Sequence, residues 1–256
     1  VAAAIEDALS AELPVARREL IVVDDGSTDG TRELVADLEE ASVVLNDENR
    51  GFGAANNQGA ALAAGPHVLF LNSDVLVHSG WLPPLLELLD DESVAAVGPR
   101  LLNPDGTLQL AGALLSRSGS TLAYGFGDDR DGAEYTFRRE VDYLSGACLL
   151  LRRSAFDEVG GFDPVFGLAY FEDADLCLRM LLCGYQGVYV PEAVFDLEVE
   201  ARRLKETMDR IGSVNLFVSE GAGLETILTE LERSGEERAW RRGPRSSPAV
   251  SVLPML

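Results

Sequence analysis

The feature that most constrains this chain is the placement of acidic and polar residues directly after short apolar runs. Asp24 and Asp25 follow one run, and Asn72 and Asp74 follow another. Short apolar runs of this kind are typical of buried strands, and in open α/β sheets ligands bind at the carboxyl ends of strands. We therefore expect the two clusters to emerge at the ends of adjacent parallel strands. Carboxylates there can accept from a nucleobase or ribose and hold a divalent cation against phosphate oxygens.

Strand and helix patterns alternate along the first part of the chain. Apolar runs predict strands at 20–23, 43–45, 68–71 and 94–97, and the stretches between them predict helices at 29–40, 54–64 and 79–89. Pro83 and Pro84 lie in the first turns of the last helix, where proline is best tolerated. The alternation predicts an α/β fold with a mostly parallel sheet and helices on both faces.

The pattern is looser in the second part. The stretch 116–140 is rich in Gly, Ser and Asp and predicts a long loop of the kind that often covers a site. Order returns with a predicted strand at 147–151 and helices near 154–159 and 172–182. The second of these helices opens with a third acidic cluster, Glu172, Asp173 and Asp175, which could supply a base.

Composition narrows the function. The chain has 256 residues, 46% of them apolar, which is enough for a normal core. Its formal charge of −22 disfavours nucleic acid and an anionic membrane surface as partners and favours a cationic cofactor. The three cysteines form no C-x-x-C pair, so a zinc site is not expected. With no apolar run long enough to span a bilayer, we expect a cytoplasmic protein, free or peripheral at the inner face of the membrane.

Several motifs in order resemble the family-2 inverting glycosyltransferases. They are IVVDDGSTDGT at 21–31, NRGFGAANNQG at 49–59, LNSD at 71–74 and GGFDPVFGLAYFEDADLCLRMLLCGY at 160–185. The segment GPRLLNPDGTLQLAG at 98–112 resembles the bacterial rhamnosyltransferase-like branch. The resemblance covers about residues 1–195 and implies a GT-A-like fold, that of nucleotide-diphospho-sugar transferases, with the donor half first and the acceptor half second.

The resemblance also implies which residues meet the donor. Asp24 and Asp25 match the acidic pair that contacts base and ribose, and the other donor contacts implied are Asn49, Arg50, Gly51 and Asn72. Simpler interpretations remain open: a turn with a helix cap at 27–30, and an ordinary helix entry at 49–51. Gly51 and Gly53 also resemble half of a dinucleotide fingerprint, but Asn56 replaces the third glycine, which disfavours a dehydrogenase.

The motif at 72–74 stands where the family has its metal-binding acidic residues. Asn72 occupies the first carboxylate position, so the resemblance makes Asp74 the contact for Mg²⁺ or Mn²⁺. One carboxylate can suffice, because Mg²⁺ keeps several waters and takes phosphate ligands. An Asx turn after a strand is the alternative.

The family pattern gives the role of general base to Asp173, with Glu172 as a supporting partner or sugar contact. In an inverting transfer this carboxylate takes the proton of the acceptor hydroxyl during attack on the anomeric carbon. Alternatively, acidic residues at a helix N-terminus serve only the helix dipole. Asp163 is a further candidate for a sugar contact, and Arg179 either reaches phosphate or forms a surface ion pair.

Two departures from the family pattern are visible. The first strand expected before a predicted helix at 2–9 is not present in the sequence, and Asp196 stands near the position where the family commonly has a metal-binding histidine. We therefore divide the chain into a glycosyltransferase domain at 1–197, a helix–strand–helix appendage at 198–240 and a disordered tail at 241–256. The stretch 202–237 resembles a fragment of pyrophosphate-dependent phosphofructokinases.

Together these features predict inverting transfer of a sugar from a nucleotide-diphosphate donor to an acceptor hydroxyl in the synthesis of a cell-surface polysaccharide. The expected donors are dTDP-rhamnose or a UDP-sugar, and the expected acceptor is a saccharide or a lipid-linked saccharide. An inactive nucleotide-binding or structural fragment of such an enzyme is the alternative.

Overall fold

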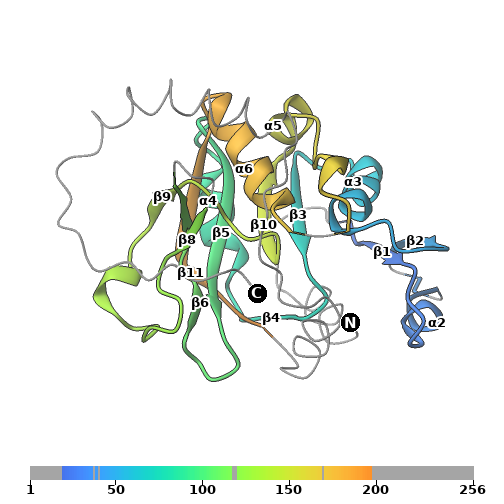
Figure 1. Cartoon of the computed structure of the whole chain (residues 1–256), viewed down its shortest axis with the longest axis horizontal. Coiled ribbons are helices and arrows are strands. Elements are labelled where there is room, and N and C mark those ends of the chain that lie inside the picture. Colours follow the sequence, from blue (N-terminus) through green and yellow to red (C-terminus); the bar gives the residue numbers. More distant parts are fainter. Residues whose placement is uncertain (1–18, 37, 40, 117–119, 169, 198–256) are drawn as a thin grey trace.

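The computed structural model describes residues 19–36, 38–39, 41–116, 120–168 and 170–197. The predicted helix at 2–9, the appendage at 198–240 and the tail at 241–256 lie outside these ranges. The described part is an α/β fold built around one large sheet (Figure 1).

The large sheet has the strand order β3-β10-β5-β11-β4, with β6 paired to β5 and β9 paired to β11. The bounds are β3 His67–Leu71, β4 Val75–Val77, β5 Val94–Leu102, β6 Leu108–Leu110, β9 Arg139–Val141, β10 Cys148–Arg152 and β11 Gln186–Leu197. Every residue of β5 is buried, so this strand lies at the centre of the core.

The direction of the strands corrects one expectation: the sheet is mixed, not mostly parallel. β5 and β11 are parallel, whereas β10 is antiparallel to both of its neighbours, β3 and β5. An apolar run identifies a buried strand but not its direction. The chain passes from β5 to β10 through β6 to β9 and not through a helical crossover. This connection therefore does not require β10 to be parallel to β5.

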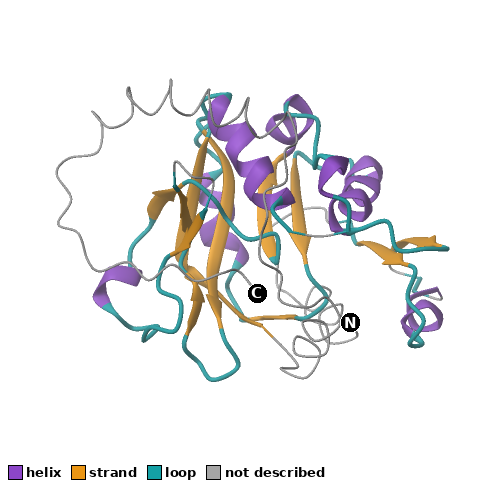
Figure 2. Cartoon of the chain, in the orientation of Figure 1, coloured by secondary structure: helices purple, strands orange, loops and turns teal. Residues whose placement is uncertain are grey.

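Helices cover the sheet on both faces, as expected. α4 (Leu82–Leu88) packs against β5 and β11, and α6 (Glu172–Leu182) packs against β11. Figure 2 shows α4 behind the sheet and α6 in front of it. α5 (Arg153–Glu158) packs on β10, and a short 3-10 helix, η2 (Pro164–Phe166), precedes α6.

The first acidic cluster lies in a separate small sheet. β1 (Ile21–Asp25) pairs in parallel with β2 (Ser42–Asn46), flanked by α2 (Thr31–Ala36) and α3 (Phe52–Leu62). The expectation that 20–23 and 68–71 form adjacent strands is therefore wrong: β1 pairs with β2, and β3 pairs with β10.

The predicted loop at 116–140 is more ordered than expected. β7 (Ala113–Leu115) pairs with β8 (Thr121–Ala123), and a 3-10 helix, η1 (Ala133–Tyr135), precedes β9. Elements of three residues are too short to show a hydrophobic period, which explains why the sequence did not reveal them. Within the described ranges no helix is long and apolar enough to cross a membrane.

Candidate active site

Asp25 shapes the loop that enters α3. Its Oδ2 accepts hydrogen bonds from the backbone N–H groups of Arg50 and Gly51, both at 2.9 Å, and its Oδ1 accepts from Asn46 Nδ2 at 2.7 Å. The Asn49 side chain also accepts from Gly51 N at 2.9 Å. One carboxylate thus holds the backbone of two of the predicted donor contacts, Arg50 and Gly51, in place.

Gly51 is required by its surroundings. Its φ is +93°, and a Cβ added there would lie 2.1 Å from the carbonyl oxygen of Gly167. Next to it, the backbone N–H of Phe52 donates to the carbonyl of Leu168 at 3.0 Å. The loop at 49–51 therefore packs directly on the segment that leads into α6.

Asp24 occupies a different environment from Asp25. Its side chain is 1% exposed, and its nearest cation is Arg32, with Nη1 at 3.9 Å from Oδ2. Neither carboxylate oxygen of Asp24 has a hydrogen-bond partner in the part of the chain that the structure describes. A buried carboxylate without donors is costly, which marks Asp24 as a group that a ligand donor would satisfy.

Three segments of the site meet around Phe52 and Gly146. A Cβ on Gly146 would lie 2.8 Å from the ring of Phe52 and 3.4 Å from Cβ of Asp173, so these three residues are in close contact. The carbonyl of the next residue, Ala147, accepts from Asn72 N at 2.9 Å. This junction connects the donor loop, the end of β3 and the start of α6. Asp74 follows two residues after Asn72 and is exposed.

Asp173 is partly buried and well hydrogen-bonded. Its Oδ2 accepts from Tyr143 Oη at 3.1 Å and from Gly146 N at 2.8 Å, and its Oδ1 accepts from Ala174 N at 2.8 Å. Burial raises the pKa of Asp173, and the donors from Gly146, Ala174 and Tyr143 partly offset that rise.

Glu172 differs from its neighbour. It is 6% exposed, and its Oε2 has no hydrogen-bond partner among the described residues. Burial, with a smaller contribution from the charge of Asp173, raises the pKa of Glu172 to about 6. A buried carboxyl with a free oxygen and a pKa close to neutrality is suited to contact a sugar hydroxyl or to exchange a proton.

Two of the predicted contact residues, Arg179 and Asp163, form hydrogen bonds within the protein. Arg179 Nε donates to Asp175 Oδ2 at 2.7 Å and Nη1 donates to the carbonyl of Val159 at 2.7 Å, which is the ion-pair alternative. Asp163 is exposed, and its Oδ1 accepts from Val165 N at 2.9 Å, so it caps η2. Both roles follow from local geometry: Arg179 lies one helical turn after Asp175, and Asp163 immediately precedes η2.

The residues after β3 fit a divalent cation chemically. Asn72 and Asp74 offer oxygen ligands, which Mg²⁺ and Mn²⁺ prefer. Within the described ranges no group of three or more His, Cys, Asp or Glu side chains could hold a metal. Asp196, at the family's histidine position, instead meets His78 across the β4–β11 pair, with Oδ2 and Nε2 3.0 Å apart.

Sequence reasoning missed the residues that support the carboxylates. Asn46 holds Asp25, Tyr143 and Gly146 hold Asp173, and Asn57 binds the backbone of Phe162, with Nδ2 to O at 2.8 Å. All but Asn57 lie in or after short strands, away from the motifs they serve. Asn57 falls inside the motif at 49–59, so its motif membership was a signal that could have found it.

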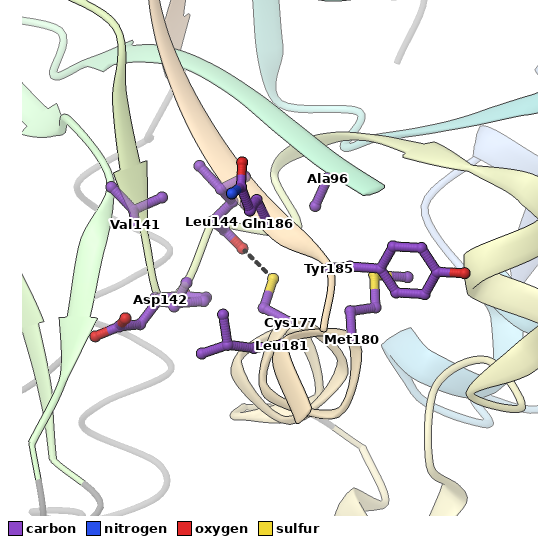
Figure 3. Close-up of a pocket in the computed structure, with 11 residues that line it drawn as sticks. Ala96, Val141, Asp142, Leu144, Cys177, Met180, Leu181, Tyr185 and Gln186 are labelled. Atoms are coloured by element: carbon purple, nitrogen blue, oxygen red, sulfur yellow. Dashed lines mark hydrogen bonds between the residues drawn. The ribbon is translucent and has the colours of Figure 1, made fainter. Parts of the chain in front are cut away.

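A small cavity lies between α6, β9 and the start of β11. Figure 3 shows Cys177, Met180 and Leu181 of α6 facing Val141, Leu144 and Gln186 across it. Its volume of about 10 Å³ admits about one water molecule. It is therefore too small for a nucleotide.

Comparison with protein families decides the identity. The model of Glycosyl transferase family 2 matches residues 1–160. The chain belongs to this family. An N-acetylglucosaminyl-diphospho-decaprenol L-rhamnosyltransferase from Mycobacterium tuberculosis is 33% identical over 209 residues, which cover 72% of this chain and 67% of that protein. The uncharacterized protein y4gI from Sinorhizobium fredii is 31% identical over 203 residues, but the chain spans only 22% of its length.

Solved structures establish the fold of this glycosyltransferase-family chain. GalNAc-T7 with UDP, GalNAc and Mn²⁺ aligns with a TM-score of 0.64 at 16% identity, covering 92% of this chain and 53% of that one. The mannosyltransferase PcManGT from Pyrobaculum calidifontis, in complex with GDP-Man and Mn²⁺, aligns with a TM-score of 0.56 at 19% identity, covering 88% and 63%. The expected GT-A-like fold is confirmed.

The resemblance of the last part of the chain is also confirmed, over a short stretch. A pyrophosphate–fructose 6-phosphate 1-phosphotransferase from Methylomonas methanica is 56% identical over 50 residues, which are 20% of this chain and 12% of that enzyme. A match to 12% of the length of that enzyme does not show that this chain has its activity.

Proposed function

We propose that this chain transfers a sugar, with inversion at the anomeric carbon, from a nucleotide-diphosphate donor to a hydroxyl of a saccharide or lipid-linked saccharide. The observation that supports this most is the junction at Phe52 and Gly146, where the donor loop, the residues after β3 and the carboxylates of α6 meet. A nucleotide bound along the loop at 49–51 would place its sugar beside Asp173.

The donor would lie along the loop that Asp25 holds. Asp24 and Asp25 serve base and ribose, Asn49, Arg50 and Gly51 line the phosphates, and Asn72 lies beside them. The exposed Asp74 carboxylate, with Asn72, would hold Mg²⁺ or Mn²⁺. When bound, such a cation neutralises the charge that develops on the leaving diphosphate.

Asp173 is the proposed general base. As the acceptor oxygen forms its bond to the anomeric carbon, the bond from that carbon to the diphosphate oxygen breaks, and the hydroxyl proton passes to the Asp173 carboxylate. Glu172 supports the reaction as a sugar contact through its free Oε2. Asp163 and Arg179, whose side chains have structural partners, contribute by shaping the segment around α6.

The proposed substrates are based on the names of the relatives. We propose dTDP-rhamnose or a UDP-sugar as donor, and a role in polysaccharide synthesis in the cytoplasm at the inner face of the membrane, because one relative is named for transfer of rhamnose to a diphospholipid-linked sugar.

Asp173→Asn tests the reaction directly. Asparagine keeps the size of aspartate but cannot take the proton, so donor binding persists while transfer falls by about 10² to 10⁴. Release of UDP or dTDP from the donor in the presence of acceptor is the measurement. Transfer at the parent rate would remove Asp173 from the proposed role.

The alternative, an inactive nucleotide-binding or structural fragment, also has support. Asp25 is already occupied by donors from the protein, and Asp24 is buried. Isothermal titration with UDP and dTDP, with and without Mn²⁺, separates the two. Mn²⁺-dependent binding together with transfer supports the enzyme, binding without transfer supports the nucleotide-binding fragment, and no binding supports the structural one.

A further inference from the structure

Asp173 is held from outside its own helix by the segment between β9 and β10. Tyr143 Oη and Gly146 N both donate to Oδ2, at 3.1 and 2.8 Å. An acceptor oxygen has two lone pairs, so these donors occupy Oδ2. Oδ1 accepts the amide of Ala174 at 2.8 Å and keeps one lone pair. The two oxygens are therefore not equivalent.

The phenol of Tyr143 is itself fixed. The residue is 2% exposed, and its backbone exchanges hydrogen bonds with Ala113, with N to O distances of 3.2 and 3.0 Å. The next residue, Leu144, accepts from Cys177 Sγ of α6 at 3.8 Å, the contact drawn in Figure 3. The hydroxyl thus comes from a rigid part of the core and not from a mobile side chain.

We propose that Tyr143 is a positioning residue for the reaction: its hydroxyl orients the Asp173 carboxylate, leaves Oδ1 as the oxygen that receives the proton, and keeps the group ionised although it is partly buried. This inference rests on the proposed function, in which Asp173 is the base. Tyr143 does not touch the substrates and acts only through Asp173.

The groups around Asp173 make this role necessary. On α6 it is adjacent to Glu172 and near Cys177, and from the β9–β10 segment it faces Tyr143. Among the described residues, the main influences on the pKa of Asp173 are burial and hydrogen-bond donors, and none of these donors is a cation. Burial raises the pKa of Asp173, and hydrogen-bond donors alone oppose that rise. Tyr143 is the donor among them that belongs to a side chain and can be removed by substitution.

Tyr143→Phe removes only the hydroxyl and keeps the ring. Loss of a donor to the ionised form raises the pKa of Asp173, because the hydrogen bond from Tyr143 stabilises the charged carboxylate. The direct measurement is a ¹³C NMR titration of the carboxyl signal that disappears in Asp173→Asn. Replacing Tyr143 with 3,5-difluorotyrosine, a more acidic phenol and stronger donor, should lower the same pKa.

Tyr189→Phe is the matched control. Tyr189 is also fully buried, and its hydroxyl donates to the carbonyl of Tyr135 at 2.9 Å and not to a carboxylate of α6. Both variants lose a buried hydroxyl and some stability, but only Tyr143→Phe should move the Asp173 titration. An unchanged Asp173 pKa in Tyr143→Phe, or an equal shift in Tyr189→Phe, overturns the inference.

Kinetics separate this inference from the proposed function. The base must be ionised, so the acid limb of the rate of transfer from dTDP-rhamnose should move to higher pH in Tyr143→Phe, with kcat reduced and the donor KM unchanged. If Asp173→Asn is inactive but the acid limb does not move, the positioning role fails and the proposed function stands. If Asp173→Asn retains the parent rate, the proposed function fails, and with it the role of Tyr143 in catalysis.

Discussion

Substitution of Gly51 by alanine tests whether the donor loop depends on its contact with the segment before α6. The structure gives Gly51 φ 93° and ψ 160°, a conformation that only glycine adopts readily, so alanine costs about 1–3 kcal/mol for the backbone alone. In addition, the new Cβ would lie 2.1 Å from the carbonyl oxygen of Gly167. Relieving that overlap costs roughly another 1–3 kcal/mol.

Gly184→Ala separates the two contributions. Gly184 has almost the same φ, +94°, but an added Cβ would meet nothing within 4 Å. We expect Gly184→Ala to lose about 1–2 kcal/mol and Gly51→Ala about 2–6 kcal/mol of the free energy of unfolding. Urea denaturation followed by circular dichroism measures both, since the midpoint shifts in proportion to the loss when the slope is unchanged.

The same pair of variants tests the site. Under conditions where both are folded, Gly51→Ala should weaken UDP or dTDP binding, because the backbone of Arg50 and Gly51 must move away from Asp25. Gly184→Ala should bind as the parent does. Equal destabilisation of the two variants would refute the steric argument, and parent affinity in folded Gly51→Ala would refute the placement of the donor along this loop.

Three further outcomes are expected. Asp74→Ala should abolish the Mn²⁺-dependent part of nucleotide-diphosphate affinity and leave the fold intact, since the residue is exposed; Mn²⁺ dependence equal to the parent's would contradict the metal assignment. Glu172→Gln should be more stable than the parent above pH 6, because a pKa raised from 4.5 to about 6 favours the protonated form in the folded state. That preference stabilises the parent below pH 4.5, and the stabilisation is lost as pH rises through 6. Thermal unfolding of both proteins across pH 4–8 should therefore show a stability difference between Glu172→Gln and the parent that grows with pH to about 1–2 kcal/mol. A difference that does not change with pH would contradict the raised pKa of Glu172. Removal of residues 198–256 should leave nucleotide affinity unchanged, since all three acidic clusters precede them; unfolding or lost binding would show that this segment belongs to the domain.

Much of the fold could be read from local patterns. Apolar runs located β1, β2, β3, β5 and β10, and the helix predicted at 172–182 has the bounds of α6. These succeed because the period of apolar residues reports on which side of an element is buried. The order of motifs likewise indicated a GT-A-like fold through its resemblance to the family-2 glycosyltransferases.

Strand direction and pairing could not be obtained in this way. The local pattern does not indicate that β10 enters the sheet antiparallel between β3 and β5, or that among the described strands β1 pairs with β2 alone. Both depend on contacts between residues far apart in the chain, whose free energy is absent from any local window. For the same reason the short strand β8, inside the stretch 116–140, was predicted as loop.

The sequence by itself determined the chemical inventory: which carboxylates follow strands, which glycines interrupt them and which acidic pair opens α6. Only the tertiary structure decided how those groups differ. In the folded chain Asp24 is buried, Asp25 accepts hydrogen bonds from the backbone of Arg50 and Gly51, and Arg179 donates to Asp175. It also brought Tyr143 to Asp173 while leaving Oε2 of Glu172 without a donor. Burial and hydrogen bonding are properties of the surroundings, and neighbouring residues in the chain, such as Glu172 and Asp173, can receive different surroundings once the chain is folded.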